Sequence, residues 1–151
     1  MSDAPDDDGP DLDLDLDAIA RASADAMWAE DRASIGLGIK LIDVGSGYAL
    51  LSMEVTEAMT NGHGTAHGGF IFALADSAFA FACNSHGDKA VAQHCTITYL
   101  RPGRLGDQLV ASAHEVAREG RSGIYDINVS VGDETVAEFR GHSRTVGGRW
   151  V

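Results

Sequence analysis

The sequence predicts an α+β fold in which one long, buried helix is wrapped by a curved antiparallel β-sheet. Residues 68–83 form an almost wholly apolar run of helical length, with apolar residues on nearly every face. Such a run predicts a helix that other elements cover on most sides. Glycine-containing turns divide most of the remaining chain into short segments with β-strand patterning, which predicts an antiparallel sheet. One face of a small sheet cannot cover the helix all round, so a second subunit can bury the rest.

The composition fits one compact domain with an acidic extension. The chain has 151 residues, of which 44% are hydrophobic, and a formal net charge of −12. Residues 1–17 contain eight aspartates and no lysine or arginine, which leaves a charge of −4 for the rest. We therefore predict a disordered acidic arm over 1–17 and a folded domain over 18–151. The acidic surface argues against nucleic acid and against membranes as partners.

The same inspection predicts a cytoplasmic protein. The N-terminus lacks the basic and apolar segments of a signal peptide. No stretch reaches the roughly 18 charge-free apolar residues of a membrane-spanning helix. Cys83 and Cys95 have no CxxC partner and lie in apolar or strand-like segments, which favours small buried thiols in a reducing compartment.

Three elements are predicted before the long helix. Residues 18–32 place apolar side chains near one helical face. Two strands follow over 36–43 and 48–55, on either side of the turn Gly45-Ser46-Gly47.

The long helix is predicted to stop near residues 84–87, and four strands follow it. Their close spacing and their turns predict an antiparallel meander over 90–100, 108–119, 123–131 and 134–146. The order of a helix, two strands, one long buried helix and four strands is the pattern of a hotdog fold.

Asp76 is the only charged residue in the run 68–83. A buried carboxylate must be paired, hydrogen-bonded or protonated, because burying it bare costs several kcal/mol or more. Asp76 is therefore either a functional group or a structural polar anchor. The glycine-led helix start and the polar segment 61–65 before it favour a functional site.

Three segments together closely resemble the phenylacetate-degradation (PaaI-type) acyl-CoA thioesterases of the hotdog superfamily. They read NGHGTAHGGFIFALADSAFAFACNSHG at 61–87, ITYLRPGRLGD at 97–107 and FRGHSRTVGG at 139–148. The resemblance covers roughly residues 20–148 and leaves out the acidic arm. It implies hydrolysis of an aryl-acetyl-CoA (phenylacetyl- or hydroxyphenylacetyl-CoA-like) or of a short- or medium-chain acyl-CoA, and it implies a tetramer built from two dimers.

The resemblance also implies roles for five residues. Asp76 matches the acidic residue that serves as nucleophile or general base. Gly68 matches the helix-start glycine whose backbone N–H polarises the thioester carbonyl, and Asn61 matches the asparagine that positions water or substrate. His67 and Ser77 match flanking polar residues with less fixed roles. Many family members have Thr in place of Ser77, so the hydroxyl is retained.

The chemistry of a thioester makes one carboxylate and one oxyanion hole sufficient. Free N–H groups at a helix start stabilise the negative charge that develops on the carbonyl oxygen. A thiol with a pKa of about 8.5 departs as thiolate without a strong general acid. We therefore predict no cofactor and no metal, with coenzyme A as part of the substrate. No His/Cys cluster has ligand spacing.

The spacing of Gly68 and Asp76 predicts a site shared between subunits. Asp76 follows Gly68 by eight residues, which is roughly 12 Å along a helix. One thioester carbon cannot touch both, so Gly68 of one subunit must meet Asp76 of another across a two-fold axis, and a dimer is the minimum active unit.

Arginines are the candidates for the phosphates of coenzyme A, with Arg101 and Arg140 selected from a set that also contains Arg104 and Arg144. Surface ion pairs are the alternative for each. Two other functions stay open: a hotdog dehydratase or hydratase of acyl thioesters that pairs His67 with an acid, and a non-catalytic acyl-CoA-binding module. The pattern of Asn61, Gly68 and Asp76 suits hydrolysis better than either.

Overall fold

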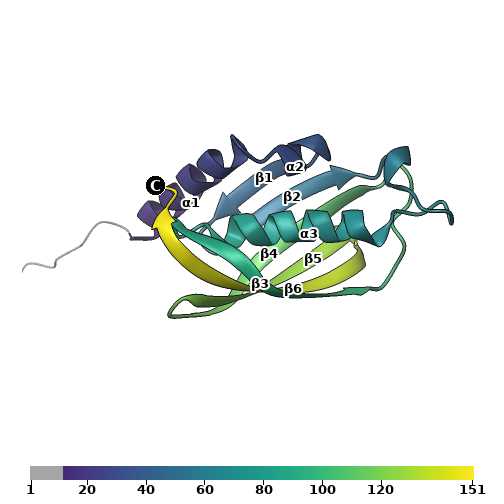
Figure 1. Ribbon diagram of the computed structural model, residues 1–151. Helices are drawn as coiled ribbons and strands as arrows, with labels where there is room; N and C mark the ends of the chain where they lie inside the picture. The colour runs from purple at the N-terminus through teal and green to yellow at the C-terminus, as the bar shows by residue number, and fades with distance from the viewer. Residues whose placement is uncertain (1–11) are drawn as a thin grey trace, which may run out of the picture.

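The computed structural model describes residues 12–151, so residues 1–11 of the predicted arm lie outside the described residues. Figure 1 shows the long helix α3 lying against the concave face of one curved sheet, which confirms the predicted α+β architecture. The elements are, in chain order, α1 (Leu12–Trp28), α2 (Arg32–Gly36), β1 (Lys40–Gly45), β2 (Tyr48–Glu54), a short 3₁₀ turn η1 (Glu57–Met59), α3 (Gly68–Cys83), β3 (Asp88–Tyr99), β4 (Gln108–Glu119), β5 (Ser122–Val131) and β6 (Glu134–Arg149).

The sheet has six strands in the order β1-β2-β4-β5-β6-β3, and every neighbouring pair is antiparallel. The predicted meander is correct for β4, β5 and β6 but wrong for β3, which pairs with β6 at the far edge. The connection 100–107 is the cause. The Gly106 N–H donates to the Val55 carbonyl at 2.8 Å, and the Val55 N–H donates to the Asp107 carbonyl at 2.9 Å. The chain therefore crosses to β2 before β4 begins.

Helix α1 corrects the predicted boundary of the acidic arm. It begins at Leu12, so residues 12–17 are helical rather than disordered, and it ends at Trp28 rather than at residue 32. Asp17 Oδ1 accepts a hydrogen bond from the Ser46 N–H at 3.0 Å, which joins α1 to the β1–β2 turn. A carboxylate early in a helix, such as Asp15, also interacts favourably with the helix dipole. Further along α1, the buried Ala20 and Ala24 pack into the core.

The strand predicted over 36–43 begins later than expected, at Lys40. Asp31 caps a second short helix, α2, because its side chain accepts from the Ser34 N–H at 3.0 Å. Gly38 follows with φ of 71°, a left-handed conformation that favours glycine, and it turns the chain into β1.

Helix α3 has the predicted bounds and forms the centre of the core. Its fully buried side includes Leu74, Ala78 and Phe79. Gly141 on β6 lies under this helix, and a Cβ at that position would stand 2.7 Å from the Phe79 ring. Glycine is therefore what lets the ring rest directly on the sheet. The helix ends at Cys83, and its C-cap Asn84 donates from Nδ2 to the Ala80 carbonyl at 2.8 Å.

One stripe of α3 faces away from the sheet. Gly69 is exposed, and Ala73, Asp76 and Ala80 are half-buried. These positions repeat every three or four residues, so they lie on a single helical face. Three of the four are small, which leaves room for the close approach of another helix. Burial of this stripe by a second subunit stays a prediction.

Two findings bear on the predicted cellular setting. Within residues 12–151, every helix is too short or too polar to span a bilayer. Cys83 and Cys95 are both free thiols, the first buried and the second partly exposed. The cytoplasmic location stays a prediction.

Candidate active site

The start of α3 presents a backbone N–H that no described residue accepts. His67 is the N-cap, in extended conformation (φ −60°, ψ 133°), and its Nδ1 accepts from the Gly69 N–H at 3.0 Å. The His67 N–H itself donates to the Met59 carbonyl at 2.8 Å. Across residues 12–151, no acceptor takes the Gly68 N–H. A free N–H at the positive end of a helix dipole is suited to stabilise an oxyanion.

Asn61 shapes the loop that precedes this helix start. Its Oδ1 accepts from the His63 N–H at 2.9 Å and from the Thr65 N–H at 3.3 Å. Gly64, with φ of 76°, closes the turn between them. The side-chain carbonyl of Asn61 is therefore engaged within its own loop, whereas its Nδ2 amide donates no hydrogen bond to the described residues and can meet water or substrate.

Asp76 lies on the uncovered stripe of α3, and no described residue pairs with it or hydrogen-bonds to it. Burial among apolar side chains raises the pKa of this carboxyl above its usual value. The sequence allowed a carboxyl that is paired, hydrogen-bonded or protonated. Within residues 12–151 of the same chain, neither an ion-pair partner nor a hydrogen-bond partner of Asp76 is found. A carboxylate of raised basicity beside a free face is suited to serve as a nucleophile or a general base.

Ser77 points toward α2 rather than toward the uncovered stripe. Its Oγ lies 2.8 Å from the Ser34 Oγ, and the Ser34 hydroxyl donates to Asp31 Oδ2 at 2.7 Å. This chain of contacts docks α2 on α3. A catalytic role for Ser77 stays a prediction.

A groove runs beside the helix start and brings Arg101 to Gly68. Its volume is about 390 Å³, and its lining residues are Ala66, Gly68, Ile71, Tyr99, Leu100, Arg101 and Pro102. The Ala66 N–H donates to the Gly103 carbonyl at 2.8 Å, which fixes the two walls of the groove to each other. Arg101 is mostly exposed, with Nη1 3.6 Å from Glu134 Oε1.

Arg140 lies elsewhere, on the face of the sheet that points away from α3. It forms a two-pronged ion pair with Asp126, at 2.6 Å from Nε and 2.8 Å from Nη2. The hydrogen bonds from Arg140 hold the pKa of Asp126 below its usual value. Within one subunit, Arg140 thus forms a surface ion pair, which was the alternative to binding coenzyme A. Contact of Arg140 with coenzyme A stays a prediction.

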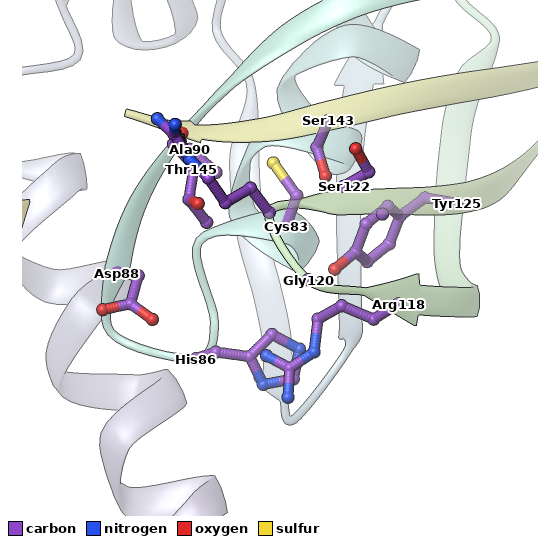
Figure 2. A pocket seen from close by; sticks show the side chains of 12 residues that line it. Cys83, His86, Asp88, Ala90, Arg118, Gly120, Ser122, Tyr125, Ser143 and Thr145 are labelled. Carbon is purple, nitrogen blue, oxygen red and sulfur yellow. Dashed lines mark hydrogen bonds between the residues drawn. The ribbon is translucent and has the colours of Figure 1, made fainter. Parts of the chain in front are cut away.

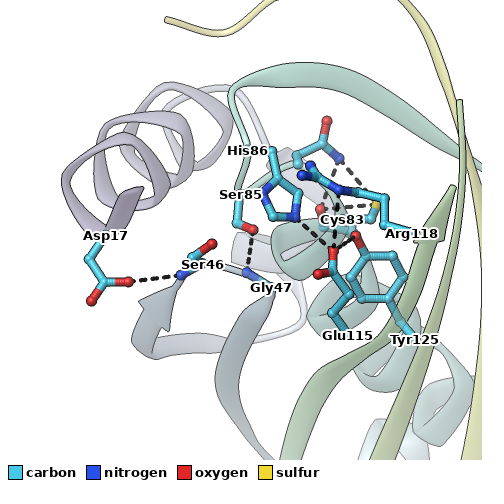
Figure 3. A network of polar contacts seen from close by, with 11 residues as sticks. Asp17, Ser46, Gly47, Cys83, Ser85, His86, Glu115, Arg118 and Tyr125 are labelled. Carbon is cyan, nitrogen blue, oxygen red and sulfur yellow. Dashed lines mark hydrogen bonds and ion pairs between the residues drawn. The ribbon is translucent and has the colours of Figure 1, made fainter. Parts of the chain in front are cut away.

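A second polar cluster, at the opposite end of α3, was not predicted as a unit. Figure 3 shows Glu115 Oε1 accepting from the Tyr125 hydroxyl at 2.8 Å and lying 2.7 Å from His86 Nε2. Although burial opposes ionisation, these two contacts hold the pKa of Glu115 below its usual value. The Ser85 hydroxyl accepts from the Gly47 N–H at 2.8 Å. Glu115 occupies an inward-facing position of β4, and this inward charge was the available sequence signal.

A small cavity of about 90 Å³ lies beside this cluster (Figure 2). Cys83, Tyr125, Ser143 and Arg118 are among its lining residues. Burial raises the pKa of the Cys83 thiol to about 12, so this thiol is un-ionised and unreactive at neutral pH. The polar cluster links the end of α3 to the sheet. The cluster and the cavity beside it lie away from the groove at Gly68.

Comparison with known proteins identifies the class. Residues 63–138 match the model of the thioesterase superfamily, and the chain belongs to this family of hotdog-fold thioester hydrolases. It is 49% identical, over 83% of its length and 91% of the relative's, to acyl-coenzyme A thioesterase PaaI of Escherichia coli K12. The structure of the E. coli PaaI protein from the phenylacetic acid degradation operon superimposes with a TM-score of 0.87 over 89% of this chain and 98% of that chain, at 46% identity.

A more distant structure shows the same fold with a ligand bound. A Streptococcus mutans protein solved in complex with acetyl CoA has a TM-score of 0.71 and 28% identity, over 74% of this chain and 90% of that chain. The predicted membership of the PaaI-type thioesterases is confirmed, as is the hotdog fold.

Proposed function

We propose that this chain hydrolyses acyl-CoA thioesters to the free acid and coenzyme A, with an aryl-acetyl group or a short or medium chain as the acyl part. The observation that carries the proposal is the Gly68 N–H, which has no acceptor within residues 12–151 and lies at the start of the helix that also presents Asp76. The E. coli relative is an acyl-coenzyme A thioesterase, and the S. mutans protein was solved with acetyl CoA, and both findings support the same substrate class.

In the proposed reaction, the thioester carbonyl oxygen receives the Gly68 N–H. Asp76 either attacks the carbonyl carbon directly or takes a proton from an attacking water. The carbon–sulfur bond breaks, and coenzyme A leaves as thiolate, because a thiol with a pKa of about 8.5 needs no strong general acid. Water supplies the oxygen of the free acid. No cofactor or metal takes part, so dialysis against a chelator leaves turnover unchanged.

The proposed site is composite. Gly68 and Asp76 stand about 12 Å apart along one helix, and the small residues Gly69, Ala73 and Ala80 flank Asp76 on its free face. An antiparallel α3 from a second subunit, packed on this stripe, places its own Gly68 near Asp76. We propose a dimer as the minimum active unit and two such dimers in the assembled tetramer, which light scattering tests.

Arg101 is the phosphate-binding candidate that the groove supports, because it lies beside Gly68 and is only loosely paired with Glu134. Replacing it in Arg101→Gln raises KM for acyl-CoA and leaves turnover at saturation nearly unchanged. For the same acyl group on a short pantetheine-like thiol without the nucleotide, Arg101→Gln and the wild type have the same KM. An equal KM for this substrate shows that the variant has lost a contact with the nucleotide phosphates and is not generally damaged.

The direct test is a panel of acyl-CoA substrates assayed by release of free thiol. Phenylacetyl-CoA, acetyl-CoA and medium-chain acyl-CoAs cover the proposed range. Hydrolysis of at least one, abolished in Asp76→Asn and retained in Asp126→Asn, supports the proposal. Tight binding of acyl-CoA without hydrolysis of any of them indicates a binding module instead, and addition of water to an enoyl-CoA indicates a hydratase.

A further inference from the structure

The peptide group between Gly68 and Gly69 is held at both of its ends by side chains. The Gly68 carbonyl accepts a hydrogen bond from the Tyr99 hydroxyl at 2.9 Å, and the Gly69 N–H donates to His67 Nδ1 at 3.0 Å. Two successive glycines otherwise have more conformational freedom than any other pair. These two contacts fix the plane of this peptide in the first turn of α3.

Tyr99 reaches Gly68 from the last residue of the edge strand β3. Its partner on β6 is Ala137, and the neighbouring Leu100 N–H donates to the Val136 carbonyl at 2.8 Å, so the backbone that carries the phenol is anchored. A Cβ at Gly68 would stand 3.0 Å from the Tyr99 ring, which shows how closely the ring covers the helix start. Desolvation raises the pKa of Tyr99, so its hydroxyl remains a donor at neutral pH.

Holding this peptide also restrains the orientation of the N–H that precedes Gly68 Cα. The Gly68 N–H belongs to the preceding peptide, and its direction is set by the torsions of Gly68 and of the His67 cap. When the Gly68–Gly69 peptide is held in place, the torsions of Gly68 are restrained, and with them its free N–H, in a residue that lines the same groove as Tyr99. A donor oriented before the reaction stabilises an oxyanion without a cost for reorientation.

We propose that Tyr99 is a positioning residue for the oxyanion hole, acting through its hydrogen bond to the Gly68 carbonyl. This inference rests on the proposed role of the Gly68 N–H. His67 shares the task at the Gly69 end, where an accepting Nδ1 places the ring proton on Nε2. Because the single hydroxyl proton of Tyr99 is donated to the Gly68 carbonyl, we assign this residue a positioning role and not a contact with the substrate oxygen.

The first test is the variant Tyr99→Phe, which keeps the ring over Gly68 and removes only the hydroxyl. We expect kcat to fall about tenfold while KM for acyl-CoA changes less than twofold, because a loosened donor weakens transition-state stabilisation more than ground-state binding. The matched control is Tyr48→Phe, whose ring contacts His114, away from the groove, and which retains wild-type kcat.

The second test reads the oxyanion hole directly. A thioester labelled with ¹³C at its carbonyl is bound to Asp76→Asn, and difference infrared spectroscopy records the carbonyl stretch. We expect a band at lower wavenumber than in water, and a return toward the water value when Tyr99→Phe is added. A merely structural role for Tyr99 lowers thermal stability without moving this band.

The outcomes separate the two proposals. If the band in Asp76→Asn matches that in water, the Gly68 oxyanion hole itself is wrong. If that band is shifted but Tyr99→Phe changes neither the band nor kcat, the oxyanion hole at the Gly68 N–H is supported and the positioning role of Tyr99 is overturned. If Tyr99→Phe does not fold, the same infrared band is measured with 3-fluorotyrosine at position 99. This stronger donor must shift the band further than tyrosine does, and an unchanged band overturns the proposal.

Discussion

Asp76 follows Gly68 by eight residues in the unbroken helix α3, with Gly68 at its first position and Asp76 on its free face. The rise of an α-helix separates the two by about 12 Å, which exceeds the reach of one thioester group. Two groups that must act on the same carbon, but are held apart by a rigid helix, require a second copy of that helix. The first prediction follows from this separation.

Subunits carrying Asp76→Asn and subunits carrying Gly68→Val are each expected to be inactive alone and to regain activity when refolded together. A mixed dimer pairs the intact Gly68 of one subunit with the intact Asp76 of the other. Random pairing of equal amounts leaves about a quarter of all sites intact, so recovery approaches about a quarter of wild-type turnover.

Native mass spectrometry of a size-tagged partner verifies that mixed dimers have formed in this experiment. Mixed dimers without any activity rule out the shared site. Activity in either variant alone removes the corresponding residue from the site.

The Asp76→Asn variant is expected to lose at least about a thousandfold in turnover, because an amide serves neither as nucleophile nor as base. It is also expected to be more stable than the wild type at neutral pH. Burial raises the pKa of Asp76 in the folded protein, so the ionised carboxylate destabilises the fold above the ordinary Asp pKa of about 3.9. The stability gain therefore disappears as the pH falls toward that value.

Thermal denaturation from pH 3 to pH 7 measures this effect, with Asp126→Asn as the control. Asp126 has a lowered pKa because Arg140 bonds its carboxylate, so its replacement shifts stability in the opposite direction or not at all. Equal melting temperatures of wild type and Asp76→Asn across this range would show that burial imposes no cost on Asp76.

The pH dependence of catalysis follows from the same carboxyl. Both proposed roles of Asp76 need the ionised form, so kcat/KM decreases as the pH falls through its raised pKa. We expect the acid limb of the profile to lie above the usual Asp value of about 3.9. An acid limb at or below that value, measured with a substrate whose own groups do not titrate there, contradicts the burial of the catalytic carboxyl.

Local signals explain which parts of the fold were predictable. Helix α3 matched its predicted bounds because its capping residues, His67 and Asn84, stand next to it in the sequence. The partner of β3 was not predictable from spacing, since the connection 100–107 gains its direction from contacts with Val55. Asp17, which was assigned to the arm, is likewise bound by the distant Ser46, a contact that no local signal reveals.

The candidate site divides in the same way. Asp76 was found because a charge in an apolar helix is visible in one segment of sequence. Tyr99 was not found, because its contact with Gly68 joins residues from two separate elements and an alternating strand gives a tyrosine no distinction. The Ser34 partner of Ser77 was missed because residues 33–35 lay between the predicted helix 18–32 and the predicted strand 36–43 and were assigned to neither.

The last prediction concerns the cluster that closes the far end of α3. Glu115 receives the Tyr125 hydroxyl and contacts His86, which links the sheet to the segment that follows α3. Removing the hydroxyl in Tyr125→Phe is expected to lower the free energy of unfolding by about 1 kcal/mol at neutral pH. Because the pKa of Glu115 is lowered in the fold, this contribution exists above the ordinary Glu pKa of about 4.3 and is lost as the pH falls through the lowered value.

Urea denaturation at pH 7 and pH 3 therefore gives a difference between wild type and variant that shrinks in acid, while Tyr48→Phe shows none at either pH. A difference that persists unchanged at pH 3 would assign the effect of Tyr125 to packing rather than to its bond with the Glu115 carboxylate.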